Sequence, residues 1–292
     1  MKDRSLCLWS CLLGFAALLN IATLPRPIPE NAHPFLAQSE WIPLEDETFI
    51  QRLQYPEKFP PALHLPDLRS LPPTDLLLQI LRGQGITRLR FTNTIWNSGP
   101  GALEMRAAPF PLPGAVQVFQ VILRTDGTSI FQNAGLFDYH DVHGHWHWDG
   151  FSIYQVWSLT PGGALDQLVA SSDKVGYCLI DMEPYPDTDA PPFPEGITPP
   201  AERQYTGCIW TYQGISAGWI DSYKSQIGGQ YVDITGLPNG VYALQSIVDP
   251  DNIIREGDDT NNGVVVYFRL EEERLMVLGE RYELPEPGQM PR

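Results

Sequence analysis

Four of the six histidines in this chain are clustered: His140, His143, His145 and His147. In a β-strand, alternate side chains share one face, so His143, His145 and His147 would project side by side. Three imidazole nitrogens at about 2 Å from one ion can hold copper, zinc, iron or nickel. The spacing therefore predicts a metal site without identifying the metal. His140 is out of phase and would be either a neighbour of that site or an exposed side chain.

Other uses of the same array stay open. A zinc hydrolase could use a similar set of histidines, but such enzymes commonly add an acidic ligand and a nearby base. Asp141 and Asp149 are the local candidates; Asp149 is the nearest acidic candidate for a base and would equally fit a strand-end residue. A non-catalytic, metal-binding or adhesive β-sandwich at the cell surface, or a polar strand face without metal, would also fit.

The elements that must position the histidines have the pattern of short strands. Several stretches alternate apolar and polar residues, as half-buried strands do. They are Thr87–Ile95, Val116–Arg124, Thr128–Phe131, Phe151–Leu159, Tyr231–Ile234, Val241–Val248 and Gly263–Leu270. Turn residues such as Asp126-Gly127, Pro161-Gly-Gly163 and Pro238-Asn-Gly240 punctuate them. The pattern predicts an all-β fold, an antiparallel β-sandwich with long irregular loops.

Composition divides the chain into four parts. Residues 1–24 predict a signal peptide or a membrane anchor, because a short basic start precedes a nearly uninterrupted apolar run. Residues 25–62 are rich in proline and predict a linker, interrupted at most by a short helix around Glu45–Gln54. Residues 63–275 would form the catalytic domain, and residues 276–292 would form a tail.

The leader implies export, so the protein would be secreted, periplasmic or at the cell surface. Cys178 and Cys208 are the only cysteines beyond the leader and predict one disulfide in an oxidising compartment. The segment from Pro184 to Pro199 would be a long irregular excursion between them. It could reshape the mouth of a site or be a tolerated surface insertion.

The charge balance limits the partners. A formal net charge of −16 and a pI near 4.6 exclude the basic stripe that nucleic-acid binding needs. The acidic surface favours a cationic partner, although a solvated surface that keeps the protein soluble would have the same composition.

Several segments, in the same order along the chain, resemble the lysyl oxidase family. The His-x-His-x-His run is similar to that family's copper-binding signature. The segment Lys174-Val-Gly-Tyr-Cys178 resembles the one that carries the lysine of its cofactor, and Gln213–Tyr223 resembles the one that carries the tyrosine. Segments at Leu65–Leu68 and Gly240–Tyr242 resemble the beginning and end of the domain.

The resemblance implies a copper-dependent amine oxidase that forms aldehyde, hydrogen peroxide and ammonia from primary amines, either peptidyl lysine or small amines. The metal would be copper, held by the three histidines. The cofactor would be lysyl tyrosylquinone, formed from Lys174 and Tyr223, and dioxygen would be the second substrate. A quinone carbonyl accepts an amine and two electrons, which no unmodified side chain can do.

The resemblance also implies a calcium site. The run from Glu256 to Asn262 contains several side chains with hard oxygen ligands, which predict either an Asx-rich turn or calcium. Combined with the start of the domain, the ligands would be Asp67, Leu68 through its carbonyl, Glu256, Asp258, Asn261 and Asn262. The domain has fewer cysteines than the animal members and no visible accessory domain, so a role in cross-linking collagen or elastin does not follow.

Overall fold

The computed structural model describes residues 62–109, 113–141, 143–185 and 198–280, which form strands, turns and loops without a helix. Within these ranges there is accordingly no helix long and apolar enough to cross a membrane. The expected leader, residues 25–61 of the expected linker with its short helix, and residues 281–292 of the expected tail lie outside the described residues. So does most of the proline-rich excursion, residues 186–197. Residues 276–279, also expected in the tail, belong instead to the last strand of the domain.

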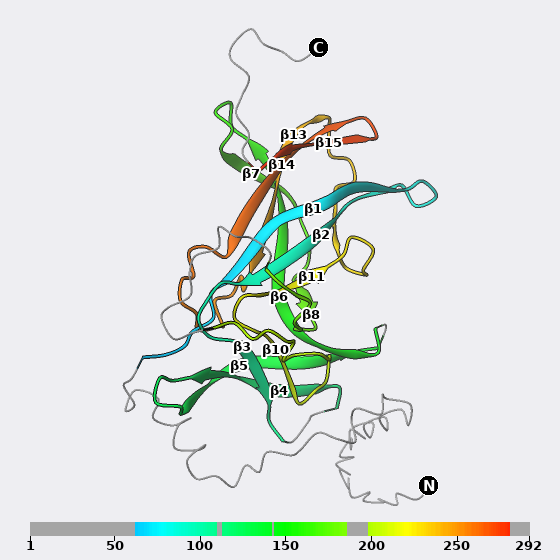
Figure 1. Ribbon diagram of the computed structural model, residues 1–292. Helices are drawn as coiled ribbons and strands as arrows, with labels where there is room; N and C mark the ends of the chain where they lie inside the picture. Colours follow the sequence, from blue (N-terminus) through cyan, green and yellow to red (C-terminus); the bar gives the residue numbers. More distant parts are fainter. Residues whose placement is uncertain (1–61, 110–112, 142, 186–197, 281–292) are drawn as a thin grey trace, which may run out of the picture.

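The strands follow one another along the chain and carry the labels used in Figure 1. They are β1 (Leu68–Leu81), β2 (Ile86–Asn97), β3 (Leu103–Ala107), β4 (Ala115–Leu123), β5 (Ser129–His140), β6 (His145–Leu159), β7 (Leu165–Ser171), β8 (Val175–Tyr177), β9 (Glu183–Pro184), β10 (Tyr212–Ile215), β11 (Trp219–Tyr223), β12 (Tyr231–Asp233), β13 (Gly240–Val248), β14 (Gly263–Glu271) and β15 (Arg274–Gly279).

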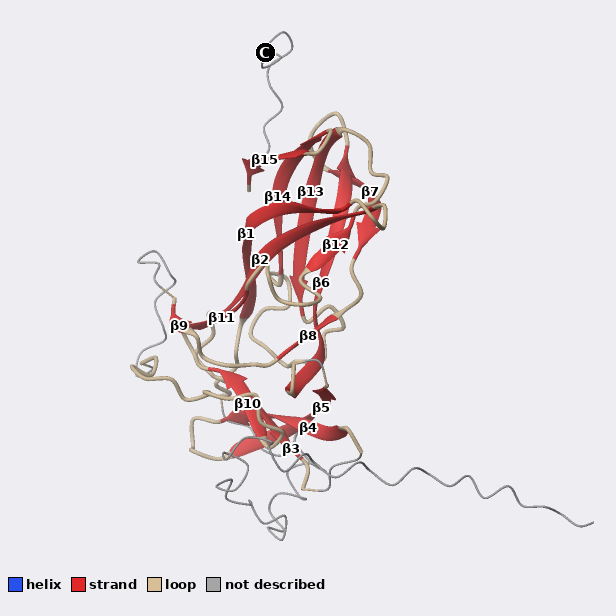
Figure 2. Ribbon diagram, turned by 90° about the vertical axis from the view of Figure 1, so that its right-hand side faces the viewer, coloured by secondary structure: helices blue, strands red, loops and turns tan. Residues whose placement is uncertain are grey.

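The strands form two sheets, and every pairing is antiparallel. The smaller sheet has the order β1-β2-β11-β9, with β12 also on β2. The larger has the order β10-β3-β4-β5-β6-β13-β14-β15, with β7 and β8 also on β6. In Figure 2, β1 and β2 lie in front of β13 and β14 as two layers. The predicted all-β, antiparallel sandwich-like fold is confirmed.

Strand β6 connects the two ends of the larger sheet (Figures 1 and 2). Its first part pairs with β5 as far as Trp148, and its second part pairs with β13 from Ser152 onward. Gly150 lies between these parts at φ 75°, a conformation that favours glycine. The first residues of β6, which include His145 and His147, therefore pair with β5 and lie before the part of the strand that joins the two-layered sandwich.

Two apolar clusters fill the interior. One lies between the sandwich layers and includes Phe91, Tyr154 and Phe268. The other lies below it and includes Trp148 and Tyr223. Burial of aromatic side chains of this size is among the largest stabilising contributions in a domain, because each removes extensive apolar area from water. The second cluster lies directly beneath the candidate functional site, and we call it the floor of that site.

Strand β1 was not among the expected strands, because Pro72 and Pro73 interrupt its pattern. Proline cannot donate a ladder hydrogen bond and is confined to edges and bulges. Here β1 is an edge strand, and its register with β2 shifts between Leu71 and Thr74. The irregularity therefore accommodates the prolines without ending the strand.

Candidate metal and cofactor site

The expected metal ligands converge, although not all from one strand. His145 and His147 lie in β6, whereas His143 lies in the turn that joins β5 to β6. That turn is closed by hydrogen bonds from the amides of His143 and Gly144 to the carbonyl of His140, at 3.0 and 2.8 Å. The expectation that a strand would present all three histidines is therefore wrong for His143, which reaches the others because the chain reverses direction.

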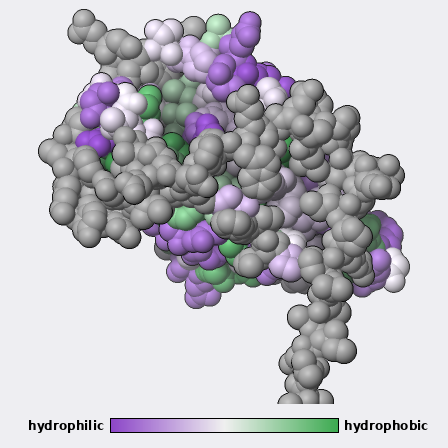
Figure 3. Space-filling model, turned by 90° about the horizontal axis from the view of Figure 1, so that it is seen from below, coloured by the Kyte–Doolittle hydropathy of each residue, from purple (hydrophilic) through white to green (hydrophobic). Residues whose placement is uncertain are grey.

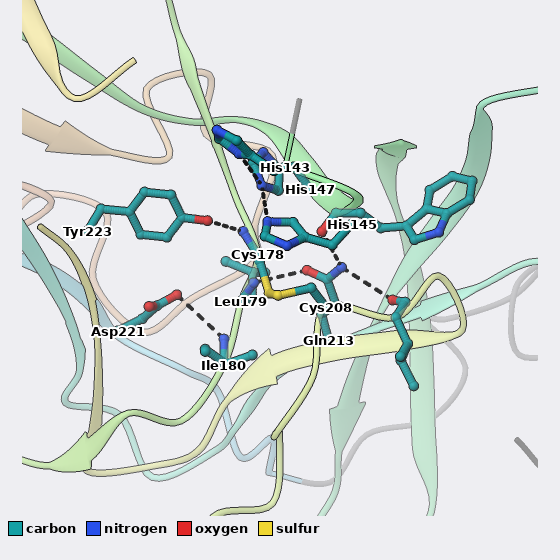
Figure 4. The surroundings of a disulfide bond; sticks show 12 residues. His143, His145, His147, Cys178, Leu179, Ile180, Cys208, Gln213, Asp221 and Tyr223 are labelled. Carbon is teal, nitrogen blue, oxygen red and sulfur yellow. Dashed lines mark hydrogen bonds between the residues drawn. A yellow bond between two sulfur atoms is a disulfide. The ribbon is translucent and has the colours of Figure 1, made fainter. Parts of the chain in front are cut away.

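The geometry of the histidine cluster (His143, His145 and His147) suits a single ion. One ring nitrogen from each residue lies within 4.8 Å of the other two. His145 Nε2 and His147 Nε2 are 2.8 Å apart, and His143 Nδ1 is 3.4 Å from His147 Nε2. Nitrogens bound at about 2 Å to one metal have comparable separations. Figure 4 shows the three rings turned toward one another.

The electrostatics of the cluster also favour a metal. Burial lowers the pKa of His147 to about 3, and the neighbouring histidines act in the same direction. Burial likewise lowers the pKa values of His143 and His145. All three rings are therefore neutral at physiological pH, and only a neutral imidazole has the free electron pair that a metal requires.

His140 lies beside this cluster without belonging to it. Its ring is exposed at the end of β5 and stacks on His147 at 5.1 Å between centroids and 15° between planes. It also lies 4.5 Å from the ring of His143. The sequence suggested either an exposed side chain or a neighbour of the site, and His140 is both.

Tyr223 ends β11 and is held against the floor of the site. It is 7% exposed, and its hydroxyl accepts a 2.7 Å hydrogen bond from the amide of Cys178. Its ring stacks on Tyr177 at 3.8 Å and lies 6.4 Å from the ring of His147. Burial raises its pKa, so the phenol is protonated at neutral pH. The ring is thus fixed next to the histidine cluster.

Lys174 occupies a different environment. It precedes β8, its side chain is 43% exposed, and its ammonium forms an ion pair with Asp251. No hydrogen bond or ion pair joins it to Tyr223, although both residues are described. The structure therefore places Tyr223 next to the histidine cluster and pairs the Lys174 ammonium with Asp251.

Asp149, the sequence candidate for a base, is exposed in β6. Its Oδ1 accepts a 2.9 Å hydrogen bond from the amide of Gly150, the next residue. Asp141, in the β5–β6 turn, is exposed as well. Neither carboxylate is among the groups that converge with the histidine nitrogens.

The predicted disulfide between Cys178 and Cys208 is confirmed. It lies beside the histidine cluster in Figure 4. The carbonyl of Cys208 accepts a 3.2 Å hydrogen bond from the amide of Trp146, which lies between His145 and His147. The amide of Cys178 binds Tyr223. One cross-link thus joins the segment under the tyrosine to the strand that carries two histidines.

Two buried side chains that the sequence analysis did not single out complete the floor. Gln213 accepts a 2.9 Å hydrogen bond from the amide of Leu179 and donates one to the carbonyl of Trp146 at 2.9 Å. Tyr177 receives the face of Tyr223 and shares a 2.7 Å hydrogen bond with Tyr154. Both lie in segments that carry the family resemblance, but nothing in their residue type indicated these contacts.

The end of the molecule that carries β3, β4 and β5 is viewed from below in Figure 3. Hydrophilic residues project at the edges of this face, and hydrophobic residues are seen in recessed areas between them.

A second polar site lies where β1 begins. We call Asp67, Leu68, Glu256, Asn261 and Asn262 the oxygen cluster. The carboxylate of Glu256 accepts hydrogen bonds from the Leu68 amide at 2.6 Å and from Asn262 Nδ2 at 2.8 Å. Asn261 Nδ2 donates to Asp67 Oδ1 at 2.9 Å. The tertiary structure therefore brings these five residues together from the two ends of the domain, although Leu68 contacts the cluster through its amide and not through the expected carbonyl.

The oxygen cluster contains buried oxygens without partners. The side-chain Oδ1 atoms of Asn261 and Asn262 are buried and accept no hydrogen bond. Buried polar atoms are almost always paired, and amide and carboxylate oxygens are the ligands that calcium prefers. Burial also raises the pKa of Glu256 to about 7. These residues fit a bound cation.

The sixth expected calcium ligand, Asp258, is arranged differently. It is exposed, and its Oδ1 accepts hydrogen bonds from the amide and hydroxyl of Thr260 at 2.9 and 2.6 Å. This is the Asx-type turn that the sequence offered as the alternative to calcium. Asp258 thus stabilises the loop that carries Asn261 and Asn262.

Comparisons of the sequence with known proteins indicate the same family that its motifs resemble. The sequence profile of the lysyl oxidase family matches residues 119–279. Human lysyl oxidase homolog 3 is 31% identical over 140 residues, which are 48% of this chain and 16% of that protein. Lysyl oxidase homolog 2 of Xenopus tropicalis is 34% identical over 125 residues, or 42% and 14% of the two chains.

The matched region is thus about one sixth of the length of these relatives. Within this chain it contains the histidine cluster, Lys174, both cysteines, Tyr223 and the Glu256–Asn262 segment. On this match, the chain belongs to the lysyl oxidase family.

Proposed function

We propose that this protein is an exported, copper-dependent amine oxidase that converts primary amines to aldehydes with release of hydrogen peroxide and ammonia. The observation that carries the proposal is the position of the buried Tyr223 ring, 6.4 Å from a ring of the convergent histidine cluster. Family membership supports the same reaction class.

Copper is the metal that fits the proposal. The cluster offers three neutral imidazoles and no carboxylate among the described residues. Imidazole suits copper and zinc alike, so the ligand set alone permits both. A redox metal such as copper could oxidise a tyrosine that is fixed beside it. A zinc hydrolase would instead need a general base beside the metal.

The cofactor would be lysyl tyrosylquinone, formed from Lys174 and Tyr223. It would supply an electrophilic carbonyl for the amine and a sink for two electrons. Tyr177 and the Cys178 amide hold the ring of Tyr223, and Gln213 and the disulfide hold the segment beneath it. A fixed ring reduces the entropy lost when the reacting groups are brought together.

The substrate would be a cationic primary amine, either a lysine side chain of a protein or a small amine. The net charge of −16 favours encounter with such cations. The confirmed disulfide supports an exported protein, because disulfides persist in oxidising compartments. Calcium in the oxygen cluster would tie the start of the domain to its end.

The proposal is tested by adding copper in air to the purified chain, its Lys174→Arg variant and its Tyr223→Phe variant. We expect the unchanged chain alone to develop a visible band that phenylhydrazine titrates, a cross-linked Lys174–Tyr223 peptide, and peroxide release with a primary amine. A copper-loaded chain with no band and no peroxide would refute the amine oxidase. It would leave a non-catalytic copper-binding protein at the cell surface.

A zinc hydrolase would give a different result. It would require zinc, would act without dioxygen, and would be indifferent to Lys174→Arg. Arginine preserves the positive charge at position 174 but cannot form the same covalent bond, so this variant separates the two reaction classes.

A further inference from the structure

We propose that Asp251 is a positioning residue that holds the Lys174 ammonium at the surface, away from Tyr223, until the cross-link forms. The inference rests on the proposed function, because it concerns how that cofactor is assembled. It starts from the contrast between the two residues: Tyr223 is 7% exposed, whereas the side chains of Lys174 and Asp251 are 43% and 46% exposed.

Asp251 is part of a rigid turn. The amide of Asp249 donates to the carbonyl of Phe151 in β6 at 2.8 Å, which fixes the turn to that strand. The buried carboxylate of Asp249 accepts hydrogen bonds from the amides of Ile253 and Ile254 at 3.0 and 2.8 Å. The Asp251 carboxylate is therefore presented from a fixed backbone.

Lys174 lies just before β8, a strand that pairs with β6. A Cβ placed at Gly150 would be 3.7 Å from the Cδ of Lys174, so the lysine stem passes over this glycine on its way to Asp251. Lysine carries several rotatable bonds, and an ion pair that fixes its end removes much of that freedom. The open surface at Gly150 and the fixed carboxylate together define one preferred position for the ammonium.

Along the chain, β8 begins directly after Lys174 and ends at the residues that contact Tyr223. The contacts of Tyr223 are with Tyr177 and Cys178, three and four residues beyond Lys174. Three residues of strand span about 10 Å. Lys174 must therefore leave Asp251 and turn along β8 before its nitrogen can meet the tyrosine ring.

The covalent step requires this release. A bond forms between Lys174 Nζ and a ring carbon of Tyr223, and the ring is oxidised by dioxygen. In total, one tyrosine, one lysine amine and two dioxygen molecules give the cross-linked quinone, one water and one hydrogen peroxide. The Lys174 nitrogen must reach the ring before this bond can form, so its ion pair with Asp251 has to open first.

The test compares Asp251→Asn with the matched control Asp173→Asn. Both remove one negative charge near Lys174, but the ion pair of Lys174 in the described residues is with Asp251. Copper is added in air, and the cross-linked peptide is measured by mass spectrometry over time. We expect Asp251→Asn to form it about two- to five-fold faster than the unchanged chain, the range set by a partly exposed ion pair. The control should keep the original rate.

An equal or slower rate in Asp251→Asn would overturn the proposal, as would equal acceleration in Asp173→Asn. A second readout does not depend on the cofactor. In metal-free protein, an amine-reactive acylating reagent should label Lys174 faster in Asp251→Asn, while labelling of the exposed Lys224 stays constant.

The rate of cross-linking and the rate of lysine labelling distinguish failure of the proposed function from failure of the proposed role of Asp251. If the unchanged chain never forms the cross-link, the proposed function fails and labelling alone decides whether Asp251 holds Lys174. Unchanged labelling of Lys174 would refute the role of Asp251 even if the amine oxidase is real.

Discussion

The histidine cluster and the oxygen cluster are two polar sites of one domain with opposite construction. The histidine cluster is local: its three residues lie within a turn and the first residues of β6. The oxygen cluster joins residues far apart in sequence, because Leu68 and Glu256 have a sequence separation of 188. The first needs one correctly shaped chain reversal, and the second exists only after the whole domain has closed.

The two sites also respond oppositely to burial. Burial lowers the pKa of His147 to about 3 and raises that of Glu256 to about 7. In both cases burial disfavours the charged form. The consequence differs, because a neutral imidazole is ready to bind a metal, whereas a neutral carboxyl must lose its proton when a cation arrives. One site is therefore preformed, and the other is coupled to binding.

Removal of a histidine should have the strongest effect. His145→Ala should weaken copper binding by more than about 100-fold, since even supporting residues around a metal contribute 10–100-fold. The cross-link should not form. Copper affinity measured by competition with a chelator checks this. His64→Ala, which lies outside the cluster, should bind copper as the unchanged chain does, and normal affinity in His145→Ala would refute the site.

Removal of the disulfide should rank second. The Cys178→Ser, Cys208→Ser double variant opens a loop with a sequence separation of 30, and we expect a loss of about 2–4 kcal/mol in the free energy of unfolding. Copper affinity should also fall, because Cys208 holds the backbone of Trp146. Chemical denaturation measures the first effect. Unchanged copper affinity would mean that the histidine cluster needs no support from this bridge.

Calcium should stabilise the domain through the oxygen cluster. At a calcium concentration 100 times its dissociation constant, we expect about 2.7 kcal/mol of added stability. Glu256→Gln should abolish most of that gain, whereas Glu202→Gln, at an exposed position, should retain it. Thermal unfolding with calcium or with a chelator measures the effect. An equal gain in both variants would place calcium elsewhere.

The weakest effects concern pH in the metal-free chain. The pKa of His147 is about 3 in the folded chain, against an ordinary value of 6.5, so its contribution to stability is present above pH 6.5 and is lost as pH falls toward 3. The pKa of Glu256 moves from 4.5 to about 7, so its contribution is present below pH 4.5 and is lost as pH rises through 7.

Two variants should separate the contributions of His147 and Glu256 to the pH dependence of stability. His147→Gln should reduce the loss of stability in acid, and Glu256→Gln should reduce the loss toward pH 7, each by up to about 1.4 kcal/mol per pH unit between the ordinary and the folded-state pKa. Denaturation midpoints across this pH range measure both. If the two variants changed the same side of the profile, the contrast between the two sites would be wrong.

The fold class, the disulfide and the cluster of histidines follow from the sequence alone. Alternating apolar residues predict strands because side chains alternate across a strand, and the two cysteines beyond the expected leader allow one bridge. Resemblance also placed Lys174, Tyr223 and the calcium residues, and these assignments stay predictions. Strand β1 was not predicted, because its prolines are tolerated only at a bulged edge.

Which of these groups meet is a property of the tertiary structure. Tyr223 is buried on Tyr177, and Lys174 instead pairs with Asp251. No sequence pattern indicated Asp251, because its role depends on how its turn is fixed beside Gly150. Local spacing sets the direction of a side chain, but contacts between distant segments depend on how the whole sheet closes, and that information is not local in the sequence.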